Sequence, residues 1–240
     1  MATKLSKDAS SQETRGQART RFAQRAVVAT ARTLFLERGY AATTIESISK
    51  HSDVPVATVY RLFSSKLGIL KAVLEVSVAG DDQGITLQGR PEVAALFAEP
   101  DPAKLLSGFA GITVAINQRC GDLYRILASA AAADQQAADL QAEFNGMRDQ
   151  GQGLIAAALA RTGSLRRGLK AGEAADLIHA LMSPELYRLL VIDRGWTPKR
   201  YQQWLAVTLV TELLPAAERP RLTVEAGLRT RRVPPGKVHG

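Results

Sequence analysis

The sequence has few of the residue types from which metal sites, disulfide frameworks and nucleophilic active sites are built. Its 240 residues include 1 cysteine and 3 histidines, and aromatic residues make up 5%. A lone cysteine cannot form an intrachain disulfide, which favours a reducing compartment, and we expect Cys120 to be a small buried thiol. The histidines, His51, His179 and His239, are scattered and lack partners at metal spacing. We therefore expect no metal and no other cofactor.

Long hydrophobic runs are also missing. No apolar stretch reaches the roughly 18 residues that predict a membrane span. Residues 1–21 contain no apolar segment of the kind that signal peptides carry. We expect a cytoplasmic protein with no membrane partner. The G-x-S-x-G, H-E-x-x-H and P-loop patterns are absent too, so no motif indicates an enzyme.

The positive charge is concentrated at the two ends of the chain. Of the net charge of +8, residues 1–66 contribute +6 (11 Lys/Arg against 5 Asp/Glu) and residues 219–240 contribute +5 (6 against 1). The residues between them hold 14 against 17, a net charge of −3. A basic N-terminal part joined to a mildly acidic body suits a unit that faces nucleic acid.

The first third of the chain shows helical periodicity broken by clear stop signals. Gly39 suits the position after a helix end, because glycine accepts a left-handed backbone conformation. The hydroxyl of Thr43 or Thr44 can accept the first N–H groups of a second helix. Pro55 ends that helix and favours the first turn of the next. The pattern predicts helices over residues 19–38, 42–51, 55–62 and 65–78.

The second and third of these helices, with a turn of about four residues between them, form a helix-turn-helix pattern, whose last helix can enter the major groove of DNA. A helix of about two turns is marginal alone, so it must be held by packing on its neighbours. Its outer face is then free to bind a ligand. Arg and Lys neutralise phosphate charge, while hydroxyls and a helix N-terminus donate to phosphate oxygens. The residues alone leave a second interpretation open, a packed helix with solvated charges.

The stretch GYAATTIESISKHSDVPVATVYRLFSSKLGIL resembles the N-terminal DNA-binding domain of the tetracycline-repressor (TetR) family of transcriptional regulators. The resemblance covers about 50 residues. The matching positions are Gly39, Tyr40, Thr43, Thr44, Ile48, Val54, Thr58, Tyr60, Phe63, Lys66 and Leu70. Three positions depart from the family pattern: Asp53 replaces a turn glycine, Pro55 replaces a capping serine, and Leu62 replaces a phosphate-contacting His or Tyr.

The resemblance implies a set of DNA-facing residues. Thr44, Tyr60 and Lys66 would contact phosphates, and the start of the third helix would reach base edges. The whole set is Thr43, Thr44, Pro55, Val56, Ala57, Thr58, Tyr60, Arg61 and Lys66. Four arginines of the arm and first helix are further candidates for the backbone or minor groove, with plain solvation as the alternative: Arg15, Arg19, Arg21 and Arg25. Tyr40 and Phe63 are expected in the core.

The rest of the chain reads as helical, so the expected fold class is all-α. Residues 81–102 read as a connection with at most one short helix. Five helices are predicted after it, over 103–118, 121–133, 135–161, 171–193 and 198–214, with Pro184 kinking or resetting the fourth. The expected organisation is a disordered basic arm (1–18), a helix-turn-helix domain (19–64), a regulatory and dimerisation domain (65–217) and a disordered basic tail (218–240).

The family resemblance also implies a small-molecule cavity among the central helices and a dimer formed by the C-terminal helix pair. Side chains that would line such a pocket, or simply fill a core, are Phe109, Ile112, Ile116, Tyr124, Leu127, Phe144 and Met147. The expected dimer face comprises Leu186, Leu189, Trp204, Leu205, Thr208 and Leu209.

Together with these observations, the family resemblance implies a homodimeric, ligand-responsive repressor that binds a palindromic operator. Its expected partners are double-stranded operator DNA, a second copy of the chain and an unidentified small-molecule effector. The fourth helix would act as a lever between the effector and the DNA-binding unit. Two other classes stay open: an enzyme, and a helical interaction adaptor whose basic N-terminus is incidental.

Overall fold

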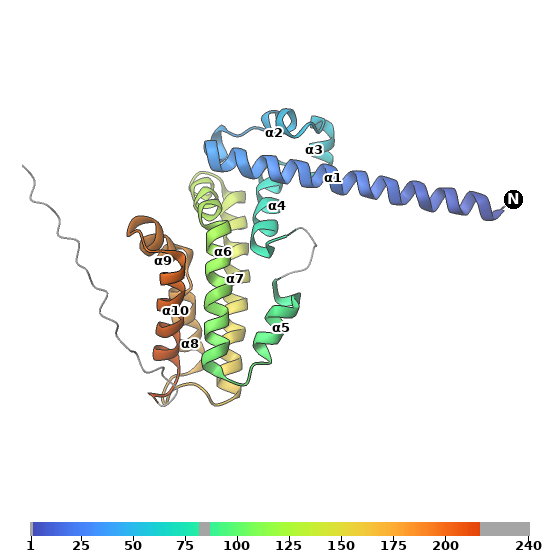
Figure 1. The fold of residues 1–240 in the computed structure, drawn as a ribbon. Helices are drawn as coiled ribbons and strands as arrows, with labels where there is room; N and C mark the ends of the chain where they lie inside the picture. The colour runs from blue at the N-terminus through green and yellow to red at the C-terminus, as the bar shows by residue number, and fades with distance from the viewer. Residues whose placement is uncertain (1, 82–86, 217–240) are drawn as a thin grey trace, which may run out of the picture.

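The computed structural model describes residues 2–81 and 87–216, and their side chains from Gly16 onward except that of Gln88. All regular structure in these ranges is helical, as the sequence predicts (Figure 1). The N-terminal part contains α1 (Ala2–Ala42), α2 (Ile45–Ser52), α3 (Val56–Phe63) and α4 (Lys66–Ala79). The body contains η1 (Leu87–Gly89), α5 (Pro91–Phe97), α6 (Pro102–Ala131), α7 (Gln135–Arg161), α8 (Ala171–Leu181), α9 (Pro184–Tyr187), η2 (Arg188–Asp193) and α10 (Pro198–Leu213).

Helix α1 is longer than predicted. It begins at Ala2 and extends away from the other helices (Figure 1), so the structure does not show the unstructured arm that we expected over 1–18. The prediction rested on the lack of apolar residues to bury. However, Ala, Lys, Gln and Arg are good helix formers, and a helix already nucleated by packed residues extends without a second nucleation cost. The regular helix is interrupted at Gly39 (φ 76°, ψ 176°), where we predicted its end. The predicted tail, 218–240, lies outside the described residues.

Helix α6 corrects a second prediction. Residues 102–131 form one helix, whereas the sequence suggested two helices separated at Gly121. A glycine inside a helix costs only about 1 kcal/mol relative to alanine. The packing of α6 on α1, α4, α7 and α10 offsets that cost. The prediction for α7 agrees with the structure, and so does the reset at Pro184, where the Ser183 hydroxyl accepts a hydrogen bond from Leu186 N (3.2 Å).

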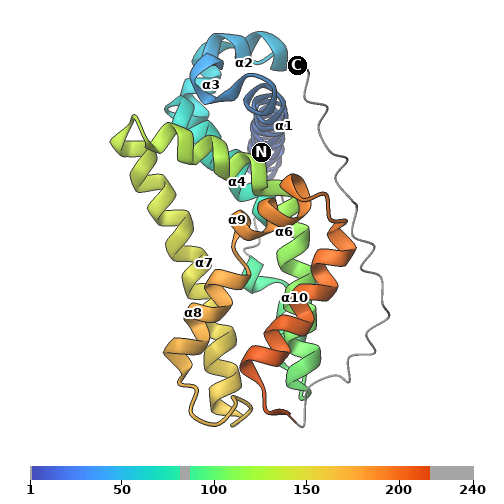
Figure 2. The same ribbon diagram turned by 90° about the vertical axis from the view of Figure 1, so that its left-hand side faces the viewer.

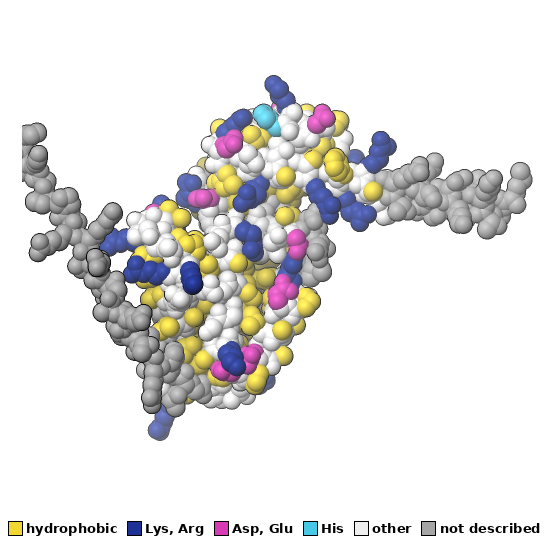
Figure 3. Space-filling view, in the orientation of Figure 1, with side chains coloured by type: hydrophobic (Ala, Val, Ile, Leu, Met, Phe, Trp, Pro, Cys, Tyr) yellow, Lys and Arg dark blue, Asp and Glu magenta, His cyan; other side chains and the backbone are white. Residues whose placement is uncertain are grey.

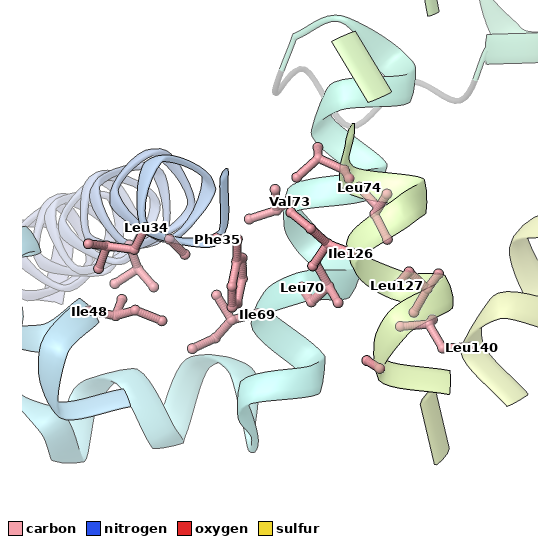
Figure 4. Packing of buried hydrophobic residues seen from close by; sticks show 14 of the residues in the cluster. Leu34, Phe35, Ile48, Ile69, Leu70, Val73, Leu74, Ile126, Leu127 and Leu140 are labelled. Atoms are coloured by element: carbon pink, nitrogen blue, oxygen red, sulfur yellow. The ribbon is translucent and has the colours of Figure 1, made fainter. Parts of the chain in front are cut away.

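The core consists of two clusters that share α6 and α7. The first joins α1–α4 to one end of α6 and α7, and Figure 4 shows α4 in its middle, with Phe35 and Ile69 on one side and Leu127 and Leu140 on the other. Tyr40 and Phe63 are partly buried and pack against this cluster, as expected. The second cluster joins α5, the other end of α6 and α7, and α8–α10.

Cys120 lies in the interior of α6 with no exposed surface. Burial raises the pKa of its thiol to about 12. The thiol is therefore protonated near neutral pH and behaves as the small buried side chain that we predicted.

Leu205 and Leu209, which we predicted on the dimer face, belong instead to the monomer core. Both are fully buried where α10 packs on α6. The apolar periodicity of α10 was assigned to the wrong partner, because a stripe of leucines looks the same in sequence whether it packs within the chain or against a second copy.

Truncation of this core stripe should destabilise the monomer itself. Leu205→Ala should lower the free energy of unfolding by about 2–5 kcal/mol, because it leaves a cavity between α10 and α6. The matched control Gln203→Ala, at an exposed position of the same helix, should change it by less than about 0.5 kcal/mol. Denaturant titration followed by circular dichroism measures both values. Equal effects of the two substitutions would contradict the burial of Leu205.

Candidate DNA-binding surface and central cavity

The turn between α2 and α3 is held by local hydrogen bonds. Thr44 caps α2: its hydroxyl accepts from Ser47 N (3.1 Å), and the Ser47 hydroxyl accepts from Thr44 N (3.1 Å). Asp53 ends α2 in the left-handed conformation (φ 54°, ψ 31°). This is the position where the family pattern has glycine, and Asp tolerates the conformation better than most other side chains. The Ser49 hydroxyl then donates to Val54 O (2.7 Å) and closes the turn.

Helix α3 is anchored by one face and exposed on the other. Val59 is fully buried, whereas Val56, Ala57, Tyr60 and Arg61 are exposed. Thr58, which is also in the predicted set, is half-buried.

Pro55 is the N-cap of α3 and is itself exposed. It offers no side-chain acceptor, so the amides of Val56 and Ala57 have no hydrogen-bond partner among the described residues. Unpaired N–H groups at a helix start bind anions well. Replacing the family's serine with proline thus leaves this helix end open to an anionic partner.

Thr43 has a different place from the one predicted. It is fully buried, and its hydroxyl donates to Gly39 O (2.8 Å), with Leu34 O at 3.2 Å. It therefore joins α2 to the end of α1 and is not available for a DNA contact. Because Thr43 and Thr44 are adjacent and chemically identical, the sequence could not show which of them faces inward.

Lys66 has partners within the chain. Its Nζ donates to Tyr40 O (2.8 Å) and lies 4.2 Å from the centre of the Tyr40 ring. Burial lowers the pKa of this amine from its usual value. The side chain thus joins the start of α4 to the end of α1, and a DNA contact by Lys66 stays a prediction.

The exposed face of the N-terminal unit is rich in positive charge. Arg19, Arg21 and Arg25 are exposed on α1, and Lys50 and Arg61 are exposed on α2 and α3. Figure 3 shows Lys and Arg side chains along this part of the molecule. The side chain of Arg15, the fourth predicted arginine, lies outside the described residues.

A partly open cavity of about 1200 Å³ lies between the N-terminal helices and the body. Its walls come from both parts of the chain: α1, α3 and α4 on one side and α5, α6 and α7 on the other. Six of the seven side chains predicted for a pocket line it: Phe109, Ile112, Ile116, Tyr124, Phe144 and Met147. The seventh, Leu127, does not line the cavity and is buried in the first core cluster instead.

The sequence analysis missed the polar side chains of this cavity. Thr113 and Asn117 from α6 and Arg148 and Gln152 from α7 all line it. A signal was available, since 113 and 117 continue the helical spacing of the apolar stripe that includes Phe109. A polar residue in such a stripe is buried and needs a hydrogen-bond partner, so it indicates a binding site more clearly than an apolar neighbour does.

Helix α4 connects the cavity to the N-terminal helices. Its residues Ala72, Glu75 and Val76 line the cavity. Arg119 of α6 donates to the last carbonyl groups of α4, from Nε to Ser77 O (2.8 Å) and from Nη2 to Val78 O (3.2 Å). These contacts satisfy carbonyl groups left open at the helix end and place a positive charge beside its negative pole.

The comparisons with known proteins agree with this architecture. Residues 27–73, which run from the buried part of α1 into α4, match the family model for bacterial regulatory proteins of the tetR family. The chain has the fold of a TetR-family transcriptional regulator. A search of the curated proteins found no match.

Solved structures of TetR-type regulators resemble the chain along most of its length. A transcriptional regulator from Saccharomonospora viridis in complex with choline is 20% identical, with 80% of this chain and 98% of that chain covered and a TM-score of 0.62. NalD, the secondary repressor of a multidrug efflux pump in Pseudomonas aeruginosa, is 19% identical (81% and 97% covered, TM-score 0.57). The triclosan complex of SmeT, an efflux-pump repressor of Stenotrophomonas maltophilia, is 17% identical (82% and 93% covered, TM-score 0.64). At these identities the likeness shows the fold.

No helix within 2–81 or 87–216 is long and apolar enough to cross a membrane. In those ranges, no three or more His, Cys, Asp or Glu side chains gather in a group that could hold a metal ion.

The left-handed turn at Asp53 gives a test of this TetR-type geometry. Asp53→Val should lower the free energy of unfolding by roughly 1–2 kcal/mol, because a β-branched residue resists a positive φ. Lys50→Val is the matched control, at an exposed helical position one turn earlier, and should cost only a few tenths of a kcal/mol. Chemical denaturation measures both, and a loss no greater for Asp53→Val than for Lys50→Val would contradict the turn conformation.

Proposed function

We propose that the chain is a ligand-responsive repressor that binds a palindromic operator as a homodimer. The proposal depends on one observation. Helix α3, which exposes the side chains expected to contact DNA, is followed directly by α4, and α4 forms a wall of the central cavity. NalD and SmeT support it, because both are repressors of efflux pumps and SmeT forms a complex with triclosan. The regulator bound to choline adds that a protein with this fold accommodates a small molecule.

On this proposal α3 is the recognition helix. Val56, Ala57 and Thr58 at its start would meet base edges, where methyl groups contact thymine and the Thr58 hydroxyl hydrogen-bonds. Tyr60 and Arg61, further along the exposed side, would contact phosphates together with Thr44 at the start of α2 and the arginines of α1. On α3, the residues that would contact base edges thus come first, and the residues that would contact phosphates follow them.

The DNA-binding role is tested by selecting duplexes from a random pool with the purified full chain. We expect an imperfect palindrome. Thr58→Val should change the preferred base at one position, with discrimination altered by about 1–3 kcal/mol. Tyr60→Phe and Arg61→Ala should weaken every duplex about equally, and Arg61→Ala should also reduce the salt slope by roughly one unit.

Arg125→Ala is the control for loss of a positive charge, because Arg125 is an exposed arginine of α6. It should leave operator affinity and salt slope unchanged. Selection of no preferred sequence would contradict the proposal and favour the interaction adaptor. Unchanged affinity and specificity after all three α3 substitutions would move the contact surface away from this helix.

A dimer is required because one α3 reads only one half-site. Two copies related by a two-fold axis would meet half-sites about 34–36 Å apart, one turn of DNA, or a multiple of that distance. Helices α8 and α10 lie side by side on one face of the body (Figure 2). On α9, η2 and α10, Leu186, Trp204 and Thr208 of the predicted face are half-buried, and Leu189 is 50% exposed. Ile192, which we had not predicted, is 65% exposed.

Charged substitutions at the two exposed apolar residues test this dimer face. The double variant Leu189→Glu/Ile192→Glu should sediment as a monomer and lose tight operator binding, because carboxylates would be buried without partners. The double variant should still fold. At a protein concentration low enough for the unsubstituted protein to be monomeric too, the two proteins should have similar melting temperatures. Leu36→Glu, at an exposed apolar position of α1, is the control and should leave the dimer intact. A double variant that remains dimeric would place the interface elsewhere.

The response to an effector would pass through α4. A ligand that fills the cavity meets Ala72 and Val76, and a change in the tilt of α4 moves α3 with it, because Lys66 and Ser65 begin α4 directly after the recognition helix. The two recognition helices would then no longer match successive major grooves. Coupling of this kind is typically worth about 1–3 kcal/mol and is reciprocal: operator DNA weakens the ligand as much as the ligand weakens the DNA.

A further inference from the structure

The polar side chains of the cavity present hydrogen-bond donors, and at least two of those donors lack acceptors. Asn117 is only 4% exposed and lines the cavity, yet its Nδ2 has no hydrogen-bond partner. A buried amide without a partner is unfavourable, so an acceptor brought by a ligand would be bound strongly there. A rotation about χ2 suffices to turn either end of the amide toward the cavity.

Arg148 fixes the direction of a second group of hydrogen bonds. An arginine can only donate, so its Nη2, 3.0 Å from His179 Nε2, makes that nitrogen an acceptor. The proton of the imidazole therefore lies on Nδ1, which donates to Gln152 Oε1 (2.9 Å). The Gln152 amide keeps its NH₂ group as a donor, and no described residue accepts from it. Arg148 Nε is likewise buried without a partner.

The positive charge of Arg148 has no buried counter-ion. The nearest carboxylate, that of Glu185, lies 4.0 Å from Nη1 and is 80% exposed. Asp149 lies beside His179 at 3.7 Å and is 73% exposed. Two other acidic residues border the cavity: Asp81 is bound by Arg90 (2.7 Å), and Glu75 is exposed on α4. Arg21 and Arg25 of α1 also line the cavity, but both are exposed, whereas Arg148 is half-buried on the same walls as Asn117 and Gln152.

Most of the remaining lining is apolar, apart from Arg21, Gln24 and Arg25 of α1 and Gln150 of α7. Phe97 and Phe109 pack together (5.1 Å between ring centres), and the aliphatic side chains include Val93, Ile112, Ile116 and Ile155. A cavity of about 1200 Å³ with this lining suits a molecule with a long or bulky hydrocarbon part. The buried donors without partners lie on α6 and α7, so such a molecule would have one polar end.

We propose that the effector of this cavity is an amphipathic organic carboxylate, whose head group is bound by Arg148, Asn117 and Gln152 and whose hydrocarbon part lies against the apolar walls. Its role as an effector rests on the proposed function, whereas its binding does not. A carboxylate supplies acceptors for all three side chains and neutralises the guanidinium. A neutral alcohol supplies fewer, and a quaternary ammonium supplies none.

Titration calorimetry on the full chain without DNA tests this with three probes that each have a ten-carbon chain: decanoate, 1-decanol and decyltrimethylammonium, each below its critical micelle concentration. Decanoate should bind at least about tenfold more tightly than either of the others. Equal affinities, or tightest binding of the ammonium compound, would overturn the proposal.

Two substitutions then locate the head group. Arg148→Met should remove the preference for decanoate while leaving 1-decanol affinity within about threefold, and Asn117→Leu should reduce the preference less, since it removes a neutral donor. Binding of 1-decanol shows that each variant is folded. Arg125→Met on the outer surface of α6 is the matched control and should change nothing. An undiminished preference for decanoate in Arg148→Met would also overturn the proposal.

A separate titration of the selected operator distinguishes this inference from the repressor function. If decanoate binds in an Arg148-dependent manner and weakens the operator, both stand. If it binds in that manner and leaves operator affinity unchanged, the carboxylate site stands and the ligand-responsive repressor falls. If the operator binds but no head-group preference exists, the DNA-binding role stands and the carboxylate site falls.

Discussion

The burial of α4 on both of its sides is the constraint on which the rest of this structure depends. Its residues Ile69, Leu70, Val73 and Leu74 are fully buried, between α1–α2 on one side and α6–α7 on the other (Figure 4). A helix of 14 residues packed in this way cannot tilt relative to one neighbour without disturbing the other. The position of α3, which α4 follows directly, is therefore set by the interior of the whole body.

Polar contacts at both ends of α4 reinforce that packing. Lys66 joins its start to Tyr40, Arg119 holds its last carbonyl groups, and Lys71 pairs with Glu143 of α7 (2.7 Å). The Lys71 pair is exposed and contributes little by itself. The Arg119 contacts are half-buried and satisfy groups that would otherwise be open. A ligand that moves α4 must overcome these contacts, which gives the proposed response a definite energetic barrier.

In the cavity, by contrast with α4, polar groups are left without hydrogen-bond partners. Donors of Asn117 and Arg148 are left without partners in an interior where nearly all such groups are normally paired. Each unpaired group costs stability, roughly 1–3 kcal/mol for a neutral donor. An unliganded binding site has this property, because a ligand later supplies the acceptors. The His179 ring holds Arg148 and Gln152 in place, so the donors are positioned before any ligand arrives.

Local signals in the sequence determined the fold class and most helix limits. Gly39, the SDVP turn and Pro184 act within a few residues of themselves, so their effect could be predicted without tertiary contacts. The same holds for the family motif from Gly39 to Leu70. Features that depend on more than a few neighbouring residues were predicted less well. The helical stretch before residue 19 and the continuity of α6 through Gly121 depend on propagation and on packing over a long helix.

Only the tertiary structure decided which helix face meets which partner. The sequence showed an apolar stripe on α10, but the structure alone assigned Leu205 and Leu209 to α6 and left Leu189 and Ile192 exposed. It likewise placed Thr43 inside and Thr44 outside, and showed that Asn117 of α6 and Arg148 of α7 line one cavity. The physical reason is that periodicity records how many side chains a helix buries and on which side, whereas the neighbour that covers them is chosen by contacts between distant segments.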